Sequence, residues 1–548
     1  MRQMWINSAG SLRLALFNAR RDWLKSAVWL LGFLVFATVI PWELDSIYGA
    51  TTQSLQAMIP MLQSPAMIAM VGPVFQPDPA KYTVGTLVAG EMLLFVMLAV
   101  AFMNILFVVR YTRQDEEQER MEIIRSLPVG RLAPLNAALI GAFVLNLLVF
   151  ALTWGGLLVM NISSITVKGA FLYAAACGVT GLIFAAIAAI CAQLASTSRA
   201  AIAYSGGIMG FLYLLRAAGD IQAAHHTWAE TLSRISPLGL ALRVEAFVTN
   251  QWWPLPYLLG TAVVLLVVAY WLNARRDLGA GLIPPKPGPA YAGPSLSSVF
   301  GLALRLQRNA LIAWVYGAVV LGASYGSIMN TIANFIDKSP FFQQALGAMH
   351  GYTVTEAFAS LIMVVLAGIA AAGTLMIAMK VWYEESSTRG ELILATAVSR
   401  RQFFASHAIL ALVCSVLLPL FSALGMWGAS AIVMKTNPIA LSFFLKAMMI
   451  YLPAIWVLLG LTLLLIAIDP RISSGVTWGY FSFSFFMGYF GQLFPQLPAW
   501  VPRLSPFGLI PNITKDAIHW QTLAYMSGLA LVMMVAAFVF YRHRDLQD

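Results

Sequence analysis

Apolar residues occupy most of the chain in long runs, and short polar or charged stretches separate these runs. Twelve of the runs have lengths near the about 20 residues that a helix needs to cross the hydrocarbon core of a bilayer. The predicted spans are 27–42, 85–109, 135–160, 170–194, 200–216, 256–273, 309–325, 355–379, 406–433, 442–467, 473–489 and 520–541. The pattern predicts an all-α polytopic membrane protein with about 12 transmembrane helices.

The composition supports this class. The chain is 60% hydrophobic and 10% charged, whereas a soluble domain carries about 25% charged residues. The net charge of +10 does not indicate nucleic-acid binding, because the charges follow the membrane topology. The three cysteines, Cys177, Cys191 and Cys414, lie inside apolar runs and are expected to pack as small core residues.

The positions of lysine and arginine predict the orientation. With the N-terminus inside the cell, 23 of the 33 Lys and Arg residues fall in inside segments, as the positive-inside rule requires. Both termini are therefore expected to be cytoplasmic. The first apolar run follows a basic stretch and is predicted to be an uncleaved span.

A charged segment occurs twice, at residues 116–131 and 385–400, with an offset of 269 residues. Six of its 16 positions are identical: Glu116/Glu385, Arg120/Arg389, Glu122/Glu391, Ile124/Ile393, Val129/Val398 and Arg131/Arg400. Residues 234–240 and 503–509 repeat at the same offset, and Arg276-Asp277-Leu278 returns as Arg544-Asp545-Leu546, one residue out of step. The chain is therefore a duplicated unit.

The duplication divides the chain into a first six-helix half at 1–278, a Pro/Gly-rich cytoplasmic linker at 279–299 and a second six-helix half at 300–548. Six spans return the chain to the side on which it started, so the two repeats are expected to be parallel, related by a pseudo-two-fold axis along the membrane normal. Each half opens with an amphipathic stretch, at 11–22 and 301–308. Such a stretch is either an interfacial helix or the basic start of the following span.

The spacing inside the charged segment predicts a short surface helix. Glu116 and Arg120 are four residues apart, as are Glu385 and Arg389, and on a helix each pair would stack on one face. Pro128 discourages helix beyond it. A solvated basic loop is the alternative, but it does not account for four acidic residues within 115–119 or for the repeat.

The segment resembles the coupling segment of ABC-2-type exporter permeases, in which an acidic and basic stretch precedes an apolar pair and a Pro-Val turn. The twelve-span duplicated form and the string R-R-D-L-G-A-G-L-I-P-P-K-P-G-P-A at 275–290 resemble bacterial permeases that export polyketide antibiotics and other drugs. The second copy departs from the pattern, since Ala397 stands in place of the proline and Ser386 in place of the second glutamate.

This resemblance implies a partner and a location. In the family the segment docks on a separate nucleotide-binding subunit, so two copies of an ATPase that binds ATP and Mg are expected, together with the bacterial inner membrane. The coupling residues that the resemblance implies are Glu116, Glu117, Arg120, Glu122, Pro128, Arg131, Glu385, Arg389, Glu391 and Arg400.

The chain itself has no G-x-x-x-x-G-K-[ST] phosphate-binding loop, no cluster of metal ligands and no cluster of polar catalytic groups at one depth. We therefore expect a non-enzymatic subunit that binds no metal or cofactor of its own.

Two features are candidates for a substrate pathway. Glu91 lies within the second predicted span, and an ionisable residue there is a functional candidate; the alternative is an ion pair with Arg216. The aromatic stretch 479–490, with Tyr480, Phe481, Phe483 and Phe485, either lines a cavity for a bulky apolar substrate or simply packs.

The repeated S-P-x-G elements lie in outer segments rich in Trp and Pro. Their residues are Ser236, Pro237 and Gly239 in the first half and Ser505, Pro506 and Gly508 in the second. Pro and Gly break helices where the backbone lines a cavity or the interface. These elements are either short re-entrant helices that cap the pathway or ordinary loops.

These observations predict the permease subunit of an ATP-driven exporter that moves hydrophobic or amphipathic compounds such as drugs or antibiotics out of the cell. The alternatives are a secondary transporter or lipid flippase driven by an ion gradient, since such carriers are also built from repeats, and a membrane scaffold that transports nothing.

Overall fold

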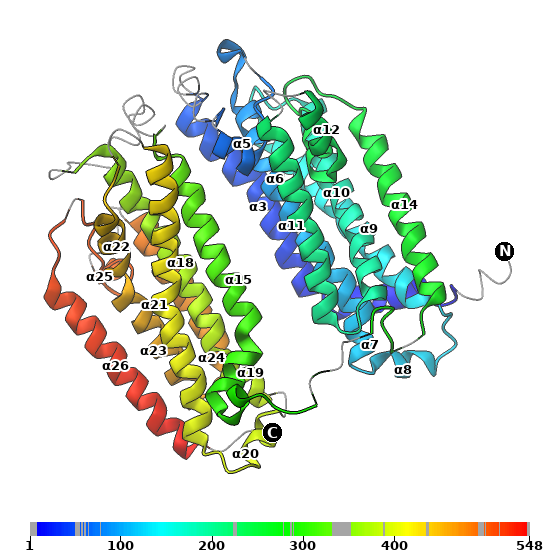
Figure 1. Ribbon diagram of the computed structural model, residues 1–548. Helices are drawn as coiled ribbons and strands as arrows, with labels where there is room; N and C mark the ends of the chain where they lie inside the picture. Colours follow the sequence, from blue (N-terminus) through cyan, green and yellow to red (C-terminus); the bar gives the residue numbers. More distant parts are fainter. Residues whose placement is uncertain are drawn as a thin grey trace. The chain divides into compact units, whose positions relative to one another are not determined.

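The computed structural model of the chain is built from helices (Figure 1). It describes residues 8–544 except 50–54, 56–58, 60–61, 64, 77, 223–226, 278, 285–287, 289, 331–351, 387–388, 435–437, 492–497, 499 and 515. Within that part of the chain there is no β-strand, and 11 helices are long and apolar enough to cross a membrane. The prediction of an all-α polytopic membrane protein is confirmed.

The chain forms two compact units, residues 1–287 and 288–548. The division falls inside the Pro/Gly-rich segment 279–299, whose first residues pack against the first unit: the backbone N–H groups of Leu282 and Ile283 donate to the carbonyls of Gln193 and Leu194 at 3.1 and 2.9 Å. Each unit is described by itself below.

The first unit centres on one helix made largely of small residues. Its described helices are α2 (Ser11–Arg21), α3 (Trp23–Tyr48), α5 (Pro65–Val71), η1 (Pro79–Lys81), α6 (Val84–Val109), η2 (Arg110–Gln114), α7 (Asp115–Glu117), α8 (Arg120–Arg125), α9 (Ala133–Val159), α10 (Val167–Leu194), α11 (Ser198–Gln222), α12 (Thr227–Ile235), α13 (Pro237–Leu242) and α14 (Pro254–Arg275). Helix α10 is mostly buried and packs against α6, α9, α11 and α14. Its many alanines and glycines allow these helices to approach closely.

A pair of asparagines joins two helices of the first unit in the apolar interior. Asn104 of α6 and Asn146 of α9 are buried and exchange hydrogen bonds in both directions, at 3.0 and 2.7 Å. Each amide also donates to the carbonyl four residues earlier in its own helix. Gly181 of α10 lies against both side chains, where an added Cβ would collide with Asn146. The pair fixes how α6, α9 and α10 pack together.

The second unit contains spans equivalent to those of the first unit, but its fifth span is less apolar than the others. Its described helices are η3 (Pro294–Ser297), α15 (Val299–Ser327), α18 (Val354–Ala378), α19 (Lys380–Ser386), α20 (Arg389–Leu394), α21 (Arg400–Val433), α22 (Leu441–Met449), α23 (Leu452–Ile468), α24 (Pro470–Phe490), α25 (Trp500–Arg503) and α26 (Trp520–His543). The predicted span 473–489 is helical as α24, but it is not among the 11 strongly apolar helices, because Ser, Gly and Tyr alternate with its phenylalanines.

The two amphipathic stretches have different structures. Helix α2 ends at Arg21, and Asp22, with φ −123° and ψ 26°, separates it from α3. The stretch 301–308 is instead the first part of the continuous helix α15. A separate helix is thus present only in the first unit among the described residues, and the second stretch is the start of its span.

Candidate functional site

The first charged segment follows α6 and folds back at one end of the first unit, close to where α14 finishes (Figure 1). Helix α6 continues as a turn of π-helix, η2, and then as α7. The chain reverses at Glu119, whose φ is +59°, and resumes as α8. The segment is therefore two short helices joined by a tight turn.

This turn changes the expected charge pairing. The prediction that Glu116 and Arg120 stack on one helix face is wrong, because the reversal at Glu119 separates them. Glu116 instead lies 3.0 Å from Arg113 and 2.8 Å from Arg276 at the end of α14, and it accepts the backbone N–H of Gly279 at 2.7 Å. Both arginines and Glu116 are almost completely buried, with exposed side-chain fractions below 10%.

A second set of ion pairs ties α2 to the same segment. Asp115 lies 3.1 Å from Arg120 and 2.9 Å from Arg21, the last residue of α2. Asp22 accepts two hydrogen bonds from Arg110, at 2.7 and 2.8 Å. Burial of Asp22 opposes ionisation, but the hydrogen bonds from Arg110, Tyr111 and Lys25 hold the pKa of its carboxyl well below the usual range.

The second charged segment has the same attachment. It forms α19 and α20, and the carboxylate of Glu385 is paired with Arg544 at the end of α26. Both side chains are less than 10% exposed. The side chain of Arg389 lies outside the described residues, so the predicted Glu385–Arg389 pair stays a prediction.

A second contact repeats in both units. Arg131 donates to the carbonyl of Arg276 at 3.1 Å, and Arg400 donates to the carbonyl of Arg544 at 2.7 Å. In each unit, therefore, one glutamate and one arginine of the charged segment hold the end of the last span. Sequence reasoning did not name Arg276 and Arg544 as partners, although their repetition as R-D-L was the available signal.

The far side of each segment is exposed and carries matching residues. Glu122 and Glu391 are exposed, and the apolar residues that follow them, Ile123 and Leu392, are 72% and 75% exposed. These two positions are related by the repeat offset of 269 residues. Pro128 lies in the exposed turn after α8. Each unit thus exposes an acid beside a large apolar side chain, on a charged segment that is attached to the last span.

The two segments differ at the second glutamate. Glu117 accepts hydrogen bonds from the backbone N–H and the hydroxyl of Ser198, at 2.9 and 2.5 Å, and so caps the first turn of α11. The equivalent helix α24 begins with its own cap, Asp469, which accepts the N–H of Arg471 at 3.0 Å. Ser386 donates to the carbonyl of Tyr383 within its own helix. The loss of the glutamate in the second copy is therefore matched by a local cap.

The S-P-x-G elements lie at the other end of each unit and are fastened to the fifth span. The buried Ser236 donates to the carbonyl of Leu212 in α11, and the buried Ser505 donates to that of Ser484 in α24, both at 2.8 Å. Pro237 begins α13 and Gly239 packs against Ser233. Pro506 begins a series of turns, and the N–H of Gly508 donates to Ser505 at 2.8 Å. Only the first element is a short helix.

Glu91 is half-buried near the N-terminal end of α6. The alternative that it pairs with Arg216 is wrong, since Arg216 binds Asp220 at 3.4 Å and the carbonyl of Ile68 at 3.1 Å. Within the described part of the chain Glu91 forms no ion pair, and its electrostatic neighbours are the phenols of Tyr48 and Tyr82.

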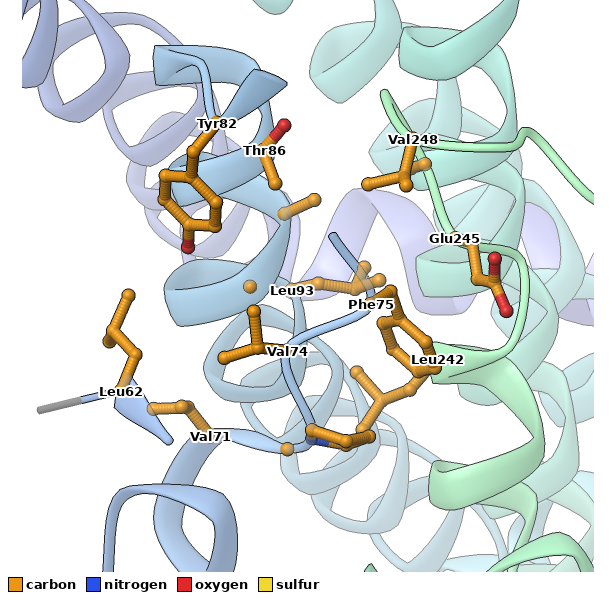
Figure 2. A pocket seen from close by; sticks show the side chains of 15 residues that line it. Leu62, Val71, Val74, Phe75, Tyr82, Thr86, Leu93, Leu242, Glu245 and Val248 are labelled. Atoms are coloured by element: carbon orange, nitrogen blue, oxygen red, sulfur yellow. The ribbon is translucent and has the colours of Figure 1, made fainter. Parts of the chain in front are cut away.

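A small cavity of about 30 Å³ lies beside the N-terminal end of α6, large enough for one water molecule. Figure 2 shows Tyr82, Val74, Phe75 and Leu242 around it. Burial and the charge of Glu91 raise the pKa of Tyr82. The cavity is thus bounded mostly by apolar groups, together with the phenol of Tyr82, the hydroxyl of Thr86 and the carboxylate of Glu245.

The aromatic side chains of α24 mostly contact one another and their neighbours. Phe481 stacks on Phe485, which meets the ring of Phe507 edge to face. Tyr480 stacks on Phe483 and donates to the carbonyl of Leu504 at 2.8 Å. These contacts favour the interpretation that the aromatic side chains pack against their neighbours where they are buried.

Removing Arg544 is expected to lower the stability of the protein more than removing Arg276, although both arginines attach a charged segment to a last span. Arg544→Met is expected to cost about 3–5 kcal/mol of unfolding free energy, because it leaves the buried Glu385 without its cation. Arg276→Met is expected to cost less, since Arg113 remains beside Glu116. Denaturant unfolding of the purified protein in detergent measures both. The control Arg275→Met, at an exposed neighbour, should change stability by about 0.5 kcal/mol or less; a loss for Arg544→Met no larger than this would contradict the attachment.

Comparison with known proteins places the whole chain in one family. The family model described as the multidrug efflux system permease Rv1217c, C-terminal domain, matches residues 296–542. The multidrug efflux system permease protein Rv1217c of Mycobacterium tuberculosis (strain ATCC 25618 / H37Rv) is 32% identical over 542 residues, which covers 98% of this chain and 95% of that protein. Both halves, with both charged segments, lie within the matched length. The chain therefore belongs to the family of multidrug efflux system permeases.

Proposed function

We propose that the chain is the permease subunit of an ATP-driven ABC exporter, which moves hydrophobic or amphipathic compounds such as drugs or antibiotics out of the cell. Two copies of a separate ATPase subunit bind ATP and Mg and dock on the two charged segments. The relative Rv1217c, a multidrug efflux system permease, supports drug export as the task.

One observation carries the ATP-driven part of the proposal. Glu122-Ile123 and Glu391-Leu392 are exposed at equivalent positions of the two units, and each lies on a segment that a buried Glu–Arg pair joins to the last span. An exposed acid beside an apolar side chain suits a protein partner, and the buried pair transmits a displacement of the segment to a transmembrane helix. A solvated loop requires neither feature.

An ion-gradient carrier is the main rival. Such a carrier is expected to hold several buried acids or an unwound span at mid-membrane. In the described spans the acids besides Glu91 lie towards helix ends, and most of them are paired: Asp220 with Arg216, Glu384 with Lys380, Glu116 with Arg276 and Glu385 with Arg544. The distribution of charge therefore favours ATP as the energy source.

Both termini and the linker face the cytoplasm in this proposal, and the chain lies in the bacterial inner membrane. The S-P-x-G elements, at the ends opposite the charged segments, then close each unit on the outside. The proposed substrate pathway runs along Glu91 in the first half and along the exposed edges of Tyr480, Phe481, Phe483 and Phe485 in the second.

Coupling is expected to depend on both exposed acids. The double variant Glu122→Arg/Glu391→Arg should abolish ATP-dependent drug transport in inverted vesicles while leaving insertion unchanged, because reversing a docked charge costs a few kcal/mol. The matched control is Glu119→Arg, an exposed acid of the same segment with no acidic counterpart in the second copy. Wild-type transport by the double variant would exclude the docking role, and so would an equal loss in the control.

The orientation is tested by labelling with a membrane-impermeant maleimide in intact cells. Cysteine at Gly288, in the linker, should remain unlabelled, whereas cysteine at the exposed Ala80 between α5 and α6 should react. The native cysteines give little background because all three are buried. Labelling at 288 from outside would overturn the orientation and the position of the docking segments.

The stoichiometry follows from the duplication. One chain already carries two docking segments, so one permease and two ATPase chains should form the complex. The segments differ at Glu117/Ser386 and Pro128/Ala397, so identical ATPases would meet unequal surfaces. Native mass spectrometry of the detergent-purified complex decides this. A mass that requires two copies of the 59.7 kDa chain would contradict the proposal.

A further inference from the structure

An apolar groove lies between α3 and α6 in the first unit. Its cavity has a volume of about 310 Å³, within the lower range of drug-binding pockets. It is lined by Val28, Trp29, Gly32, Phe33, Phe36, Phe95, Val96 and Ala99. All of these side chains are apolar, and four of them are aromatic.

The groove is open to the surroundings of the first unit between α3 and α6. Val28, Phe36 and Phe95 are 64%, 44% and 40% exposed. A Cβ added to Gly32 would meet no atom within 4 Å, so the floor of the groove is empty at this residue. The opposite face of α3 packs on α9, where Ala37 and Thr38 contact Gly156. One side of α3 thus packs against α9, and the other side borders the groove.

An acid lies on α6 one turn beyond the residues that line this groove. Glu91 precedes Phe95 by one turn of α6, about 6 Å along the axis, and Tyr48 at the end of α3 is its electrostatic neighbour. Glu91 therefore lies on the side of α6 that faces α3. Glu43 and Asp45 add acidic groups in the last turns of α3. The described cation nearest to Glu91 along the chain, Lys81, is paired with Asp78 at 3.6 Å.

The second half shows that the acid is not required by the fold. The repeat offset relates Glu91 to Ser360 and Arg243 to Asn512, and Ser360 donates to Asn512 at 2.9 Å. In the first unit this link is not made, because Arg243 is held by Glu230 at 2.5 Å and Asp220 at 3.6 Å. The second half thus has a neutral hydrogen-bonded pair at this position, Ser360 and Asn512. The first half has the carboxylate of Glu91 instead, and no described cation neutralises it.

From this arrangement we infer that the α3–α6 groove binds a cationic amphiphile, with its apolar body against Trp29, Phe33 and Phe95 and its positive charge towards Glu91. A neutral lipid chain would gain nothing from the acid, and an anionic compound would be repelled by it. The aromatic walls also attract a delocalised cation through their π faces. The inference names the substrate class of the proposed exporter, and it rests on that proposed function only for its physiological meaning.

Binding to the purified full chain tests the groove without the ATPase, so the result does not depend on coupling. The probes are tetraphenylphosphonium, a monovalent cation, and triphenylphosphine oxide, a neutral compound with similar apolar surface, each measured by equilibrium dialysis. Glu91→Gln should weaken binding of the cation at least tenfold and change binding of the neutral compound less than twofold. Gly32→Leu fills the open floor and should weaken binding of both.

The matched control is Glu356→Gln, at the outer end of α18, the equivalent helix of the second unit. Glutamine can retain the capping box that Glu356 forms with Thr353, so this variant should bind both probes as the wild type does. Unchanged cation binding in Glu91→Gln would overturn the assignment of the acid. Unchanged binding in Gly32→Leu would overturn the groove as the site, and an equal loss in Glu356→Gln would show only a general effect of surface charge. If Glu122→Arg/Glu391→Arg fails to stop transport while these results hold, the ATP-driven function fails and the binding site stands.

Discussion

A buried ion pair between the charged segment and the end of the last span determines the arrangement of each half. Glu116 meets Arg276 in the first unit and Glu385 meets Arg544 in the second. A charge in such a position is costly unless a partner of opposite sign neutralises it, so the segment and the span end must remain together. Arg131 and Arg400 strengthen the same junction through the carbonyls of Arg276 and Arg544. The exposed acids and apolar residues beyond it therefore lie on a segment that is attached to the end of the last span.

The same junction is supported differently in the two units. In the first, Arg113 gives Glu116 a second cation, Glu117 caps α11, and Asp115 and Asp22 join the segment to α2. In the second, α24 supplies its own cap and α15 runs unbroken from its amphipathic start. Duplication has thus preserved the attachment to the last span, while the contacts around it have diverged. The first segment is held by more polar contacts than the second among the described residues.

The sequence determined most of the helical architecture, because a run of apolar residues near 20 long has few alternatives to a transmembrane helix. It was less informative where tertiary contacts override local spacing. Glu116 and Arg120 have the spacing of a helical pair, but the left-handed turn at Glu119 separates them and the stronger partner, Arg276, lies 160 residues away. Spacing within a segment cannot reveal such a partner. Internal repetition could have, since Arg276 and Arg544 recur with the segments that they bind.

The ends of the units opposite the charged segments also show that local sequence does not reveal tertiary contacts. Glu91 was recognised as an acid within a span, but its position above an apolar groove depends on how α3 packs against α6. The S-P-x-G elements have nearly identical sequences, yet only the first forms a helix. Their serines also bond to carbonyls that are not repeat equivalents, Leu212 in the first unit and Ser484 in the second. Local motifs predicted where the helical spans end, and packing decided the shape that the chain takes there.

Amide hydrogen exchange of the permease with and without the proposed ATPase subunit tests the central claim most directly. Docking on both exposed surfaces should slow exchange in α8 and in α20, and should leave α13, at the opposite end of the first unit, unchanged. Exchange that stays the same in both short helices when the ATPase binds, or protection confined to other segments, would contradict the account.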